Sequence, residues 1–454
     1  MSKTPAKEHR SYALPIAIMF ALFFMIAFVT GYQNPLGEVI KKMTGGNPVL
    51  SQLGTLANFI AYAFMGYPAG KLLEKKGYRM TALYAVTVGF TGVLITFLSG
   101  MIETEGEGAT HAVIVYLIGA FVAGFSMCML NTVVNPMLNS LGKDQKQGNQ
   151  LVQFGGTCNS LGATLAPVIV GGLIGGSAST IASANPVFYM AMAIFALAFV
   201  IIYFSDLPED PELGKKKDPR NQPKVSGALR YSNLRWGLAA IFCYVGIEVG
   251  IANWTMQYLT ASNEVITGNP EFEAAAIAGT VVGMYWLFML CGRFIGGVIG
   301  GKVSSRAMLT ATSLTAIVLL VLGITVTGKT VGFVGFDSGH MLFSTVNVPL
   351  SAIFFVCCGF CTSVMWGAIF NLSVEGLGKY TAIASGLFMV MVCGGGILPT
   401  IQGFIANSTI LGSFWLTVAL AAYLLIYALF LSHPDKKEPQ HKEELTEDGA
   451  VAEL

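Results

Sequence analysis

The stretch VFYMAMAIFALAFVIIYF, residues 187–204, is followed by the polar segment SDLPEDPELGKKKDPRNQPKVSGALRYSN, residues 205–233, and this pair decides the fold. The first stretch is apolar throughout, and its length is close to the roughly 20 residues that a helix needs to cross a bilayer. The second is charged and contains prolines, so we place it in water. A chain that alternates between such segments is expected to be an integral membrane protein.

The same alternation runs along the whole chain. Six apolar stretches precede residues 205–233 and six follow. The twelve stretches cover residues 14–32, 53–69, 81–98, 112–134, 151–174, 187–204, 237–256, 276–298, 308–326, 350–370, 382–405 and 411–431. We predict an all-α membrane protein with twelve transmembrane helices in two pseudo-symmetric six-helix lobes.

The polar segment sets the expected domain boundaries. The N-terminal lobe is predicted to cover residues 1–204 and the C-terminal lobe residues 234–432, with residues 205–233 as a cytoplasmic linker. Residues 433–454 are rich in Glu and Lys, and this composition predicts a disordered cytoplasmic tail.

Composition excludes several classes of protein. Hydrophobic residues make up 54% of the chain and charged residues only 11%, against about 25% charged in ordinary globular proteins. A net charge of +1 offers no positive field for nucleic acid. All eight cysteines fall inside apolar runs, which fits neither a disulfide framework nor a zinc site. We therefore expect no nucleic-acid partner, no metal and no cofactor.

The distribution of basic residues predicts orientation. If each Lys and Arg is assigned to its nearest connection, Arg293 included, all but Lys41, Lys42 and Lys329 of the 26 lie on the side of the N-terminus. Cytoplasmic connections carry such an excess of positive charge. Both termini are thus expected in the cytoplasm, with the protein in the cell (inner, cytoplasmic) membrane.

The two halves show a weak internal similarity. The residues SLGK at 140–143 match GLGK at 376–379, each after a corresponding span. Duplicated halves with a site between them are typical of secondary transporters. Glycines precede a proline in span five (Gly155, Gly156 and Pro167) and in span eleven (residues 394–396 and Pro399). Bending there would suit alternating access, and close packing of small residues is the alternative.

Glu248 is the exception among the 25 acidic residues, because the others lie in loops, tails or near helix ends. It falls near the middle of span seven, where an ionised carboxylate costs several kcal/mol. Burial should keep it protonated until water or a partner reaches it, so it could carry a proton. We expect no Lys, Arg or His at membrane depth to pair with it. The alternative is a neutral side chain that makes one interhelical hydrogen bond.

Uncharged amide side chains are the second group of candidate functional residues. They lie in or beside apolar helices at Gln33, Asn34, Asn58, Asn131, Asn135, Gln150, Gln153, Asn159, Asn253, Gln257, Asn371 and Gln402. Amides donate and accept hydrogen bonds without charge, which suits a neutral ligand rich in hydroxyl groups. Each could instead hold two helices together.

Three tryptophans could add apolar faces for a sugar ring. Trp254, Trp286 and Trp366 lie in spans seven, eight and ten. Their rings are flat and apolar with one polar N–H, a combination that packs well on sugars. Tryptophan at a helix end is alternatively an interfacial anchor.

Two short motifs are interpreted as coincidence. Residues 323–330, GITVTGKT, satisfy the phosphate-loop pattern, but that pattern requires a preceding strand and a following helix. Here it ends a membrane span, with Lys329 outside. Cys358 and Cys361 spell C-x-x-C inside an apolar helix without a second pair. We expect no nucleotide partner and no enzyme activity.

The ordered set of motifs resembles the fucose permease type of sugar:proton symporter, in the major facilitator superfamily. The matching pieces are PAGKLL at 68–73, NP at 135–136, NSLGA at 159–163, YVG at 244–246 with Glu248, and GLGKY at 376–380 followed by GGGI at 394–397. The resemblance covers essentially all twelve spans. It implies the major facilitator fold, with a sugar held between the lobes at mid-membrane and a proton gradient as the driving force.

The chain departs from the family pattern at three polar positions. The family has an acidic residue late in span one and another in span four, and these positions fall on Asn34 and Asn131. A glutamine of the family falls on Gly156, with Gln153 one turn away. Glu248 is then the remaining membrane-embedded carboxylate.

We therefore predict proton-coupled symport of a neutral monosaccharide, similar to fucose, glucose or galactose, by a protein that acts as a monomer in the lipid bilayer. Glu248 is the expected proton carrier. The predicted substrate-binding residues are Gln33, Asn34, Asn131, Asn135, Gln153, Asn159, Tyr244, Asn253, Trp254, Trp286, Trp366 and Asn371. Because Asn34 and Asn131 replace acids, a passive sugar facilitator or a sodium-coupled transporter is the alternative.

Overall fold

The structure, a computed structural model, describes most of the chain. The described residues are 12–102, 107–142, 145–174, 180–209, 225–262, 265, 274–299, 303–337 and 342–433. The predicted tail beyond His433 and much of the predicted linker, residues 210–224, lie outside them.

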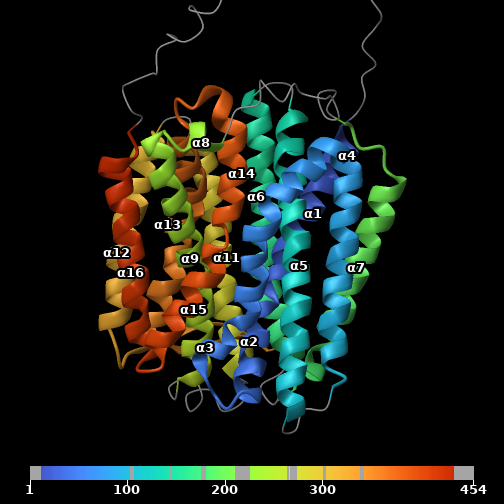
Figure 1. Ribbon diagram of the computed structural model, residues 1–454. Helices are drawn as coiled ribbons and strands as arrows, with labels where there is room; N and C mark the ends of the chain where they lie inside the picture. Colours follow the sequence, from blue (N-terminus) through green and yellow to red (C-terminus); the bar gives the residue numbers. More distant parts are fainter. Residues whose placement is uncertain are drawn as a thin grey trace, which may run out of the picture.

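Helices gather in two groups that follow the order of the sequence, with the first half of the chain on one side of the bundle and the second half on the other (Figure 1). The first half contains α1 (Ala13–Gly31), α2 (Gln33–Met43), α3 (Pro48–Ser51), α4 (Leu53–Ser99), α5 (Glu107–Ser140), α6 (Gln145–Ile174), the 3₁₀ turn η1 (Ile181–Ala184) and α7 (Asn185–Phe204).

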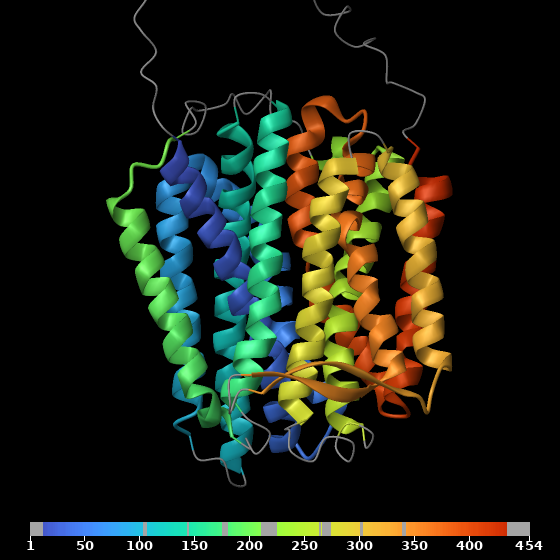
Figure 2. The ribbon, with the colours of Figure 1, turned by 180° about the vertical axis from the view of Figure 1, so that it is seen from behind.

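The second half begins after residues 210–224. It contains α8 (Val225–Ala228), α9 (Ser232–Ala261), α11 (Ala274–Ile299), α12 (Ser305–Thr325), β1 (Thr330–Asp337), β2 (Leu342–Pro349), α13 (Leu350–Val374), η3 (Gly378–Tyr380), α14 (Thr381–Met391), α15 (Gly394–Ala406), α16 (Ile410–Ile426) and the π-helical turn η4 (Tyr427–Leu431). The start of α1 and the end of η4 lie on the same side of the bundle (Figures 1 and 2).

Each of the twelve predicted apolar stretches is helical over most of its length. By length and composition, ten helices of the described chain could cross a membrane. One of them, α4, holds two predicted stretches, and α6 adds a more polar helix that packs against α1 and α11. Helices suit this environment because all of their backbone polar groups are satisfied internally.

The two stretches within α4 are joined at Gly77. Its φ of 77° and ψ of 178° are not helical, and they lie in a region that glycine enters readily because it has no Cβ. Beyond the kink, the Glu209 carboxylate accepts hydrogen bonds from the backbone N–H groups of Tyr78 at 2.6 Å and Arg79 at 2.9 Å. The start of the second stretch is thereby capped from the segment that follows α7.

Of the two spans with glycines before a proline, span eleven is interrupted and span five is one continuous helix. α14 ends at Met391 and α15 begins at Gly394, whereas α6 runs uninterrupted from Gln145 to Ile174. Its small residues instead allow close packing against α1. A Cβ at Gly162 would lie 2.3 Å from the backbone oxygen of Phe24.

A β-hairpin, absent from the predicted architecture, follows α12. β1 and β2 pair antiparallel, from Thr330 opposite Pro349 to Asp337 opposite Leu342. The hairpin lies across the face opposite the termini (Figure 2). The phosphate-loop pattern therefore runs from the end of α12 through a turn at Gly328, with φ of 72°, into β1. This helix–turn–strand order is the reverse of what the phosphate loop requires.

Candidate functional site

A cavity of about 910 Å³ lies between the two halves. At one end it is lined by Thr55 on α4 and Asn253 on α9. At the other end it reaches Gln150, Ser305 and Asn371, which lie near the ends of α6, α12 and α13 on the side of the termini. The cavity is therefore open toward the termini in this conformation.

The far end of the cavity is closed by a group of neutral side chains that we call the distal contact: Gln52, Thr55 and Asn253. The amide nitrogen of Asn253 donates to Oε1 of Gln52 at 2.7 Å and to Oγ1 of Thr55 at 3.3 Å. All three residues are buried, and the bonds join α9 to the start of α4. The distal contact thus holds the two halves together on the side away from the termini.

Helix α2 adds further bonds across the halves beside the distal contact. The Nζ of Lys41 donates to Oε1 of Gln257 at 2.8 Å, and the hydroxyl of Thr260 donates to Oε1 of Glu38 at 3.0 Å. Glu38 and Lys41 also face each other on α2, with 3.9 Å between their charged atoms. The partners on α9 are therefore both neutral.

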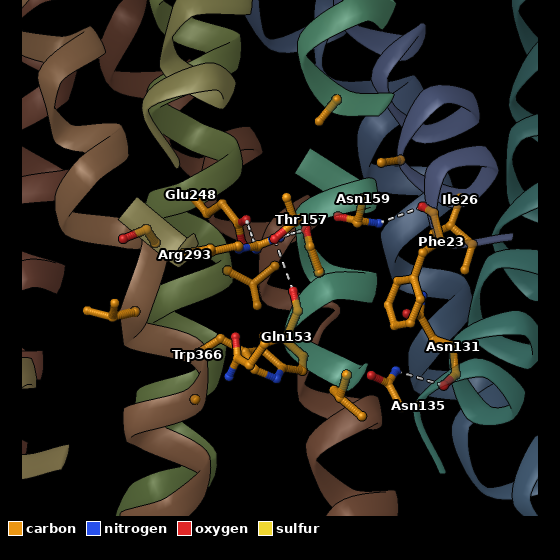
Figure 3. Close-up of a pocket in the computed structure, with 18 of the residues that line it drawn as sticks. Phe23, Ile26, Asn131, Asn135, Gln153, Thr157, Asn159, Glu248, Arg293 and Trp366 are labelled. Carbon is orange, nitrogen blue, oxygen red and sulfur yellow. Dashed lines mark hydrogen bonds and ion pairs between the residues drawn. The ribbon is translucent and has the colours of Figure 1, made fainter. Parts of the chain in front are cut away.

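Farther toward the termini, Gly156, Glu248 and Arg293 line the cavity, and together with the buried Ser160 they form a cluster that we call the central junction. Nη2 of Arg293 on α11 lies 3.6 Å from Oε1 of Glu248 on α9. Nη1 of Arg293 donates to the Gly156 carbonyl oxygen and to Oγ of Ser160 on α6, each at 2.9 Å. Figure 3 shows Glu248 beside the guanidinium.

The expectation that no basic residue pairs with Glu248 was wrong. Arg293 was counted with the cytoplasmic connections because it precedes a glycine-rich turn, yet α11 continues to Ile299. The missed signal was in the prediction itself, because the predicted stretch 276–298 already contains Arg293. Its side chain is 16% exposed and that of Glu248 is 14% exposed, so the two form a largely buried ion pair.

Three predicted amides line the cavity from the first half. Asn131 donates to the hydroxyl of Tyr62 at 3.1 Å, and Asn135 donates to the Asn131 carbonyl at 2.9 Å. Asn159 on α6 donates to the Phe23 carbonyl on α1 at 3.1 Å. The bonds of Asn131 and Asn159 join neighbouring helices, whereas the bond of Asn135 stays within α5. All three leave the side-chain oxygens of the amides as possible acceptors (Figure 3).

The cavity is also lined by other predicted residues. Gln153 on α6 and Asn253 on α9 face it from opposite halves. Trp286 and Trp366 contribute aromatic surface from α11 and α13. Asn371 lies at the open end, where its amide donates to Oγ of Ser305 at 3.4 Å.

Other predicted site residues do not line the cavity. The oxygen of the Gln33 side chain accepts a hydrogen bond from the Tyr116 hydroxyl, within the first half. Trp254 is fully buried, with its ring nitrogen donating to the Pro399 carbonyl at 3.0 Å. Tyr244 is buried next to Glu248, with its ring edge-on to Trp366 at 6.2 Å between centroids. Asn34 belongs to α2, and its side chain lies outside the described part of the structure.

Comparison with known families identifies the class of protein. The sequence model of the Major Facilitator Superfamily matches residues 18–398. The chain belongs to the Major Facilitator Superfamily. It is thus a multi-pass membrane transporter and not an enzyme, as the sequence predicted.

Individual relatives cover nearly the whole chain. A glucose/galactose transporter of Brucella abortus is 28% identical over 439 residues, covering 94% of this chain and 96% of the relative. The L-fucose-proton symporter of Escherichia coli is 23% identical over 436 residues, covering 89% of each. The chain is therefore similar to the fucose permease type of the superfamily.

Solved structures support the fold. The transporter FucP in its outward conformation aligns with a TM-score of 0.63 at 20% identity, over 93% of this chain and 100% of that one. A D-xylose-proton symporter aligns with a TM-score of 0.62 at 11% identity, over 93% and 97% of the two chains. Both alignments extend over more than nine tenths of this chain, so they support the same overall fold.

Proposed function

We propose that this transporter moves a neutral monosaccharide together with protons by alternating access, and that Glu248 carries the proton. The observation that carries the proposal is the position of Glu248, whose carboxylate forms a largely buried ion pair in the wall of a cavity between the halves. Relatives named for glucose, galactose and fucose transport support a sugar as the substrate.

The chemistry of the cavity fits a neutral polyhydroxy ligand. Asn131, Asn135, Gln153 and Asn159 supply amides on the first half. On the second half, the amide oxygen of the buried Asn253 has no hydrogen-bond partner among the described residues. Hydroxyl groups of a sugar could complete such bonds, since each donates and accepts. Trp286 and Trp366 offer apolar faces for the ring.

Orientation assigns the open end of the cavity to one side of the membrane. We place the protein in the inner membrane with both termini in the cytoplasm, because 23 of the 26 basic residues were assigned to that side. Moving Arg293 from the connections into the membrane leaves 22 there, so the excess of positive charge on that side remains. The cavity is then open to the cytoplasm and closed outside by the distal contact. This conformation is the one that would release sugar and protons into the cell.

Passive or sodium-coupled sugar transport remains the second candidate, since amides occupy the positions where acids are expected, Asn34 and Asn131. The ion pair favours proton coupling, because protonation of Glu248 changes the net charge of the pair. Sugar uptake that is independent of pH and dependent on sodium would favour the second candidate.

The proposal is tested by sugar uptake into proteoliposomes under an imposed proton gradient. We expect the wild type to concentrate a hexose, and we expect Glu248→Gln to lose accumulation while it retains exchange of internal for external sugar. The matched control is Glu375→Gln, which removes an exposed carboxylate at the end of α13 and should accumulate sugar normally. Full accumulation by Glu248→Gln would overturn the proposal.

A further inference from the structure

One guanidinium in the central junction contacts the proton site and the opposite half of the bundle at once. Arg293 lies on α11 in the second half, as does Glu248 on α9. Its hydrogen bonds go to Gly156 and Ser160 on α6, in the first half. A change in the charge of Glu248 therefore acts on a side chain that spans the boundary between the halves.

The distances show which contacts of Arg293 are hydrogen bonds. Nη1 lies 2.9 Å from each of its two acceptors on α6, which is the range of hydrogen bonds made by charged groups. Nη2 lies 3.6 Å from the Glu248 carboxylate, which is too long for a hydrogen bond. Arg293 is therefore hydrogen-bonded to the opposite half and attracted to Glu248 by charge alone.

Protonation of Glu248 changes what must stabilise the guanidinium. Arginine stays charged in proteins. While Glu248 is ionised, the two charges offset each other. After Glu248 takes a proton, the positive charge remains at a site that is only 16% exposed, where an unpaired charge is costly. The Gly156 carbonyl and the Ser160 hydroxyl then supply the nearest dipoles, so conformations that keep α6 close to Arg293 become favoured.

Other ionisable groups near Glu248 are few in the described chain. Arg293 and Tyr285 approach it from α11, and Tyr244 lies beside it on α9. The Tyr285 hydroxyl donates to the backbone oxygen of Glu248 at 3.2 Å. Within the described chain, the ion pair of the Glu248 carboxylate is with Arg293, on α11. Protonation of Glu248 therefore changes the electrostatic environment of Arg293 directly.

We propose that Arg293 is a positioning residue that converts protonation of Glu248 into a preference for the conformation described here, through its hydrogen bonds to Gly156 and Ser160. The inference rests on the proposed role of Glu248 as proton carrier. In a symport cycle, a proton taken up outside would favour closure of the outer side, and its release into the cytoplasm would weaken that preference and allow return.

The test follows protonation and conformation separately in the full-length protein in nanodiscs. The carbonyl band of protonated Glu248 is measured by infrared spectroscopy and assigned by its loss in Glu248→Gln. Conformation is measured as the distance between spin labels at Ser140 and Val303, two exposed residues on the side of the termini, in a background without reactive native cysteines. In the wild type, acidification through the infrared transition should lengthen this distance, because the cavity opens on that side.

Two variants distinguish the hydrogen bonds between Arg293 and α6 from the protonation of Glu248 itself. Ser160→Ala should keep the infrared transition and reduce the accompanying change in the conformational equilibrium constant about tenfold, the size expected for a hydrogen bond to a charged group. Arg293→Gln should abolish the distance change. The matched control is Thr164→Val, one turn along α6, whose hydroxyl donates only to the Ser160 backbone oxygen at 2.8 Å. It should behave like the wild type.

Retention of the full pH-dependent distance change in both Ser160→Ala and Arg293→Gln would overturn the inference, as would a wild type whose distance does not follow the infrared transition. If Arg293→Gln does not fold, Ser160→Ala decides alone. A wild type whose distance follows Glu248, but which does not concentrate sugar in proteoliposomes, would contradict the proposed function and support the inference.

Discussion

The distal contact and the central junction connect the same two halves of the bundle with different chemistry. In the distal contact, Asn253 bonds to Gln52 and Thr55, which are neutral at every physiological pH. In the central junction, the bonds to α6 come from Arg293, whose partner Glu248 can gain or lose a proton. We therefore expect the distal contact to set how stable the closed outer side is, and the central junction to make that stability depend on protons.

The largest expected effect distinguishes the two charges of the central junction. Glu248→Ala leaves Arg293 charged and without its partner, so we expect the free energy of unfolding to fall by about 3 kcal/mol. Arg293→Gln should cost less, because Glu248 can neutralise itself by taking a proton. Denaturant unfolding in mixed micelles measures both. Equal losses in the two variants would show that the ion pair has no such asymmetry.

An intermediate effect is expected in the distal contact. Asn253→Ala leaves the buried Oε1 of Gln52 without this donor, at a cost of about 1–3 kcal/mol, so the equilibrium should move about fivefold to a hundredfold away from the described conformation. Accessibility of a cysteine introduced on the outer side measures this shift, which should be the same at acidic and alkaline pH. A shift that grows with pH would contradict the division of roles between the two contacts.

The control for Asn253→Ala is an amide with a similar bond inside one half. The side chain of Asn58 is buried and donates to the Ala120 carbonyl at 3.3 Å, from α4 to α5. Asn58→Ala should lower stability without moving the equilibrium between conformations, because this bond does not cross the boundary.

The smallest effect is expected at Gly156. A Cβ there would lie 3.8 Å from Nη1 of Arg293, an ordinary van der Waals contact. Since Arg293 bonds to the backbone oxygen, Gly156→Ala should keep sugar accumulation near the wild-type level and raise stability by up to about 1 kcal/mol, the difference between these residues inside a helix. Uptake and unfolding measurements check this. A loss of transport would show that the junction depends on steric fit at α6.

Sequence alone determined the membrane spans. Unpaired backbone groups and charged side chains are costly in the bilayer, so each span is visible as a long apolar run between charged connections. The sequence also identified Glu248, since a carboxylate in the middle of an apolar stretch is visible without a fold. The hairpin of β1 and β2 was missed: its strands lie outside the apolar stretches, and their pairing depends on contacts across a turn.

Tertiary structure decided which polar residues share the cavity. Asn253 and Trp254 are neighbours in sequence, yet one lines the cavity and the other is buried against Pro399. Likewise Arg293, close to a helix end in sequence, reaches Glu248 and α6 only because its helix continues and packs against both. Hydropathy reports how deep a residue lies in the membrane, but the direction in which a side chain points, and its partner, depend on how the helices pack against one another.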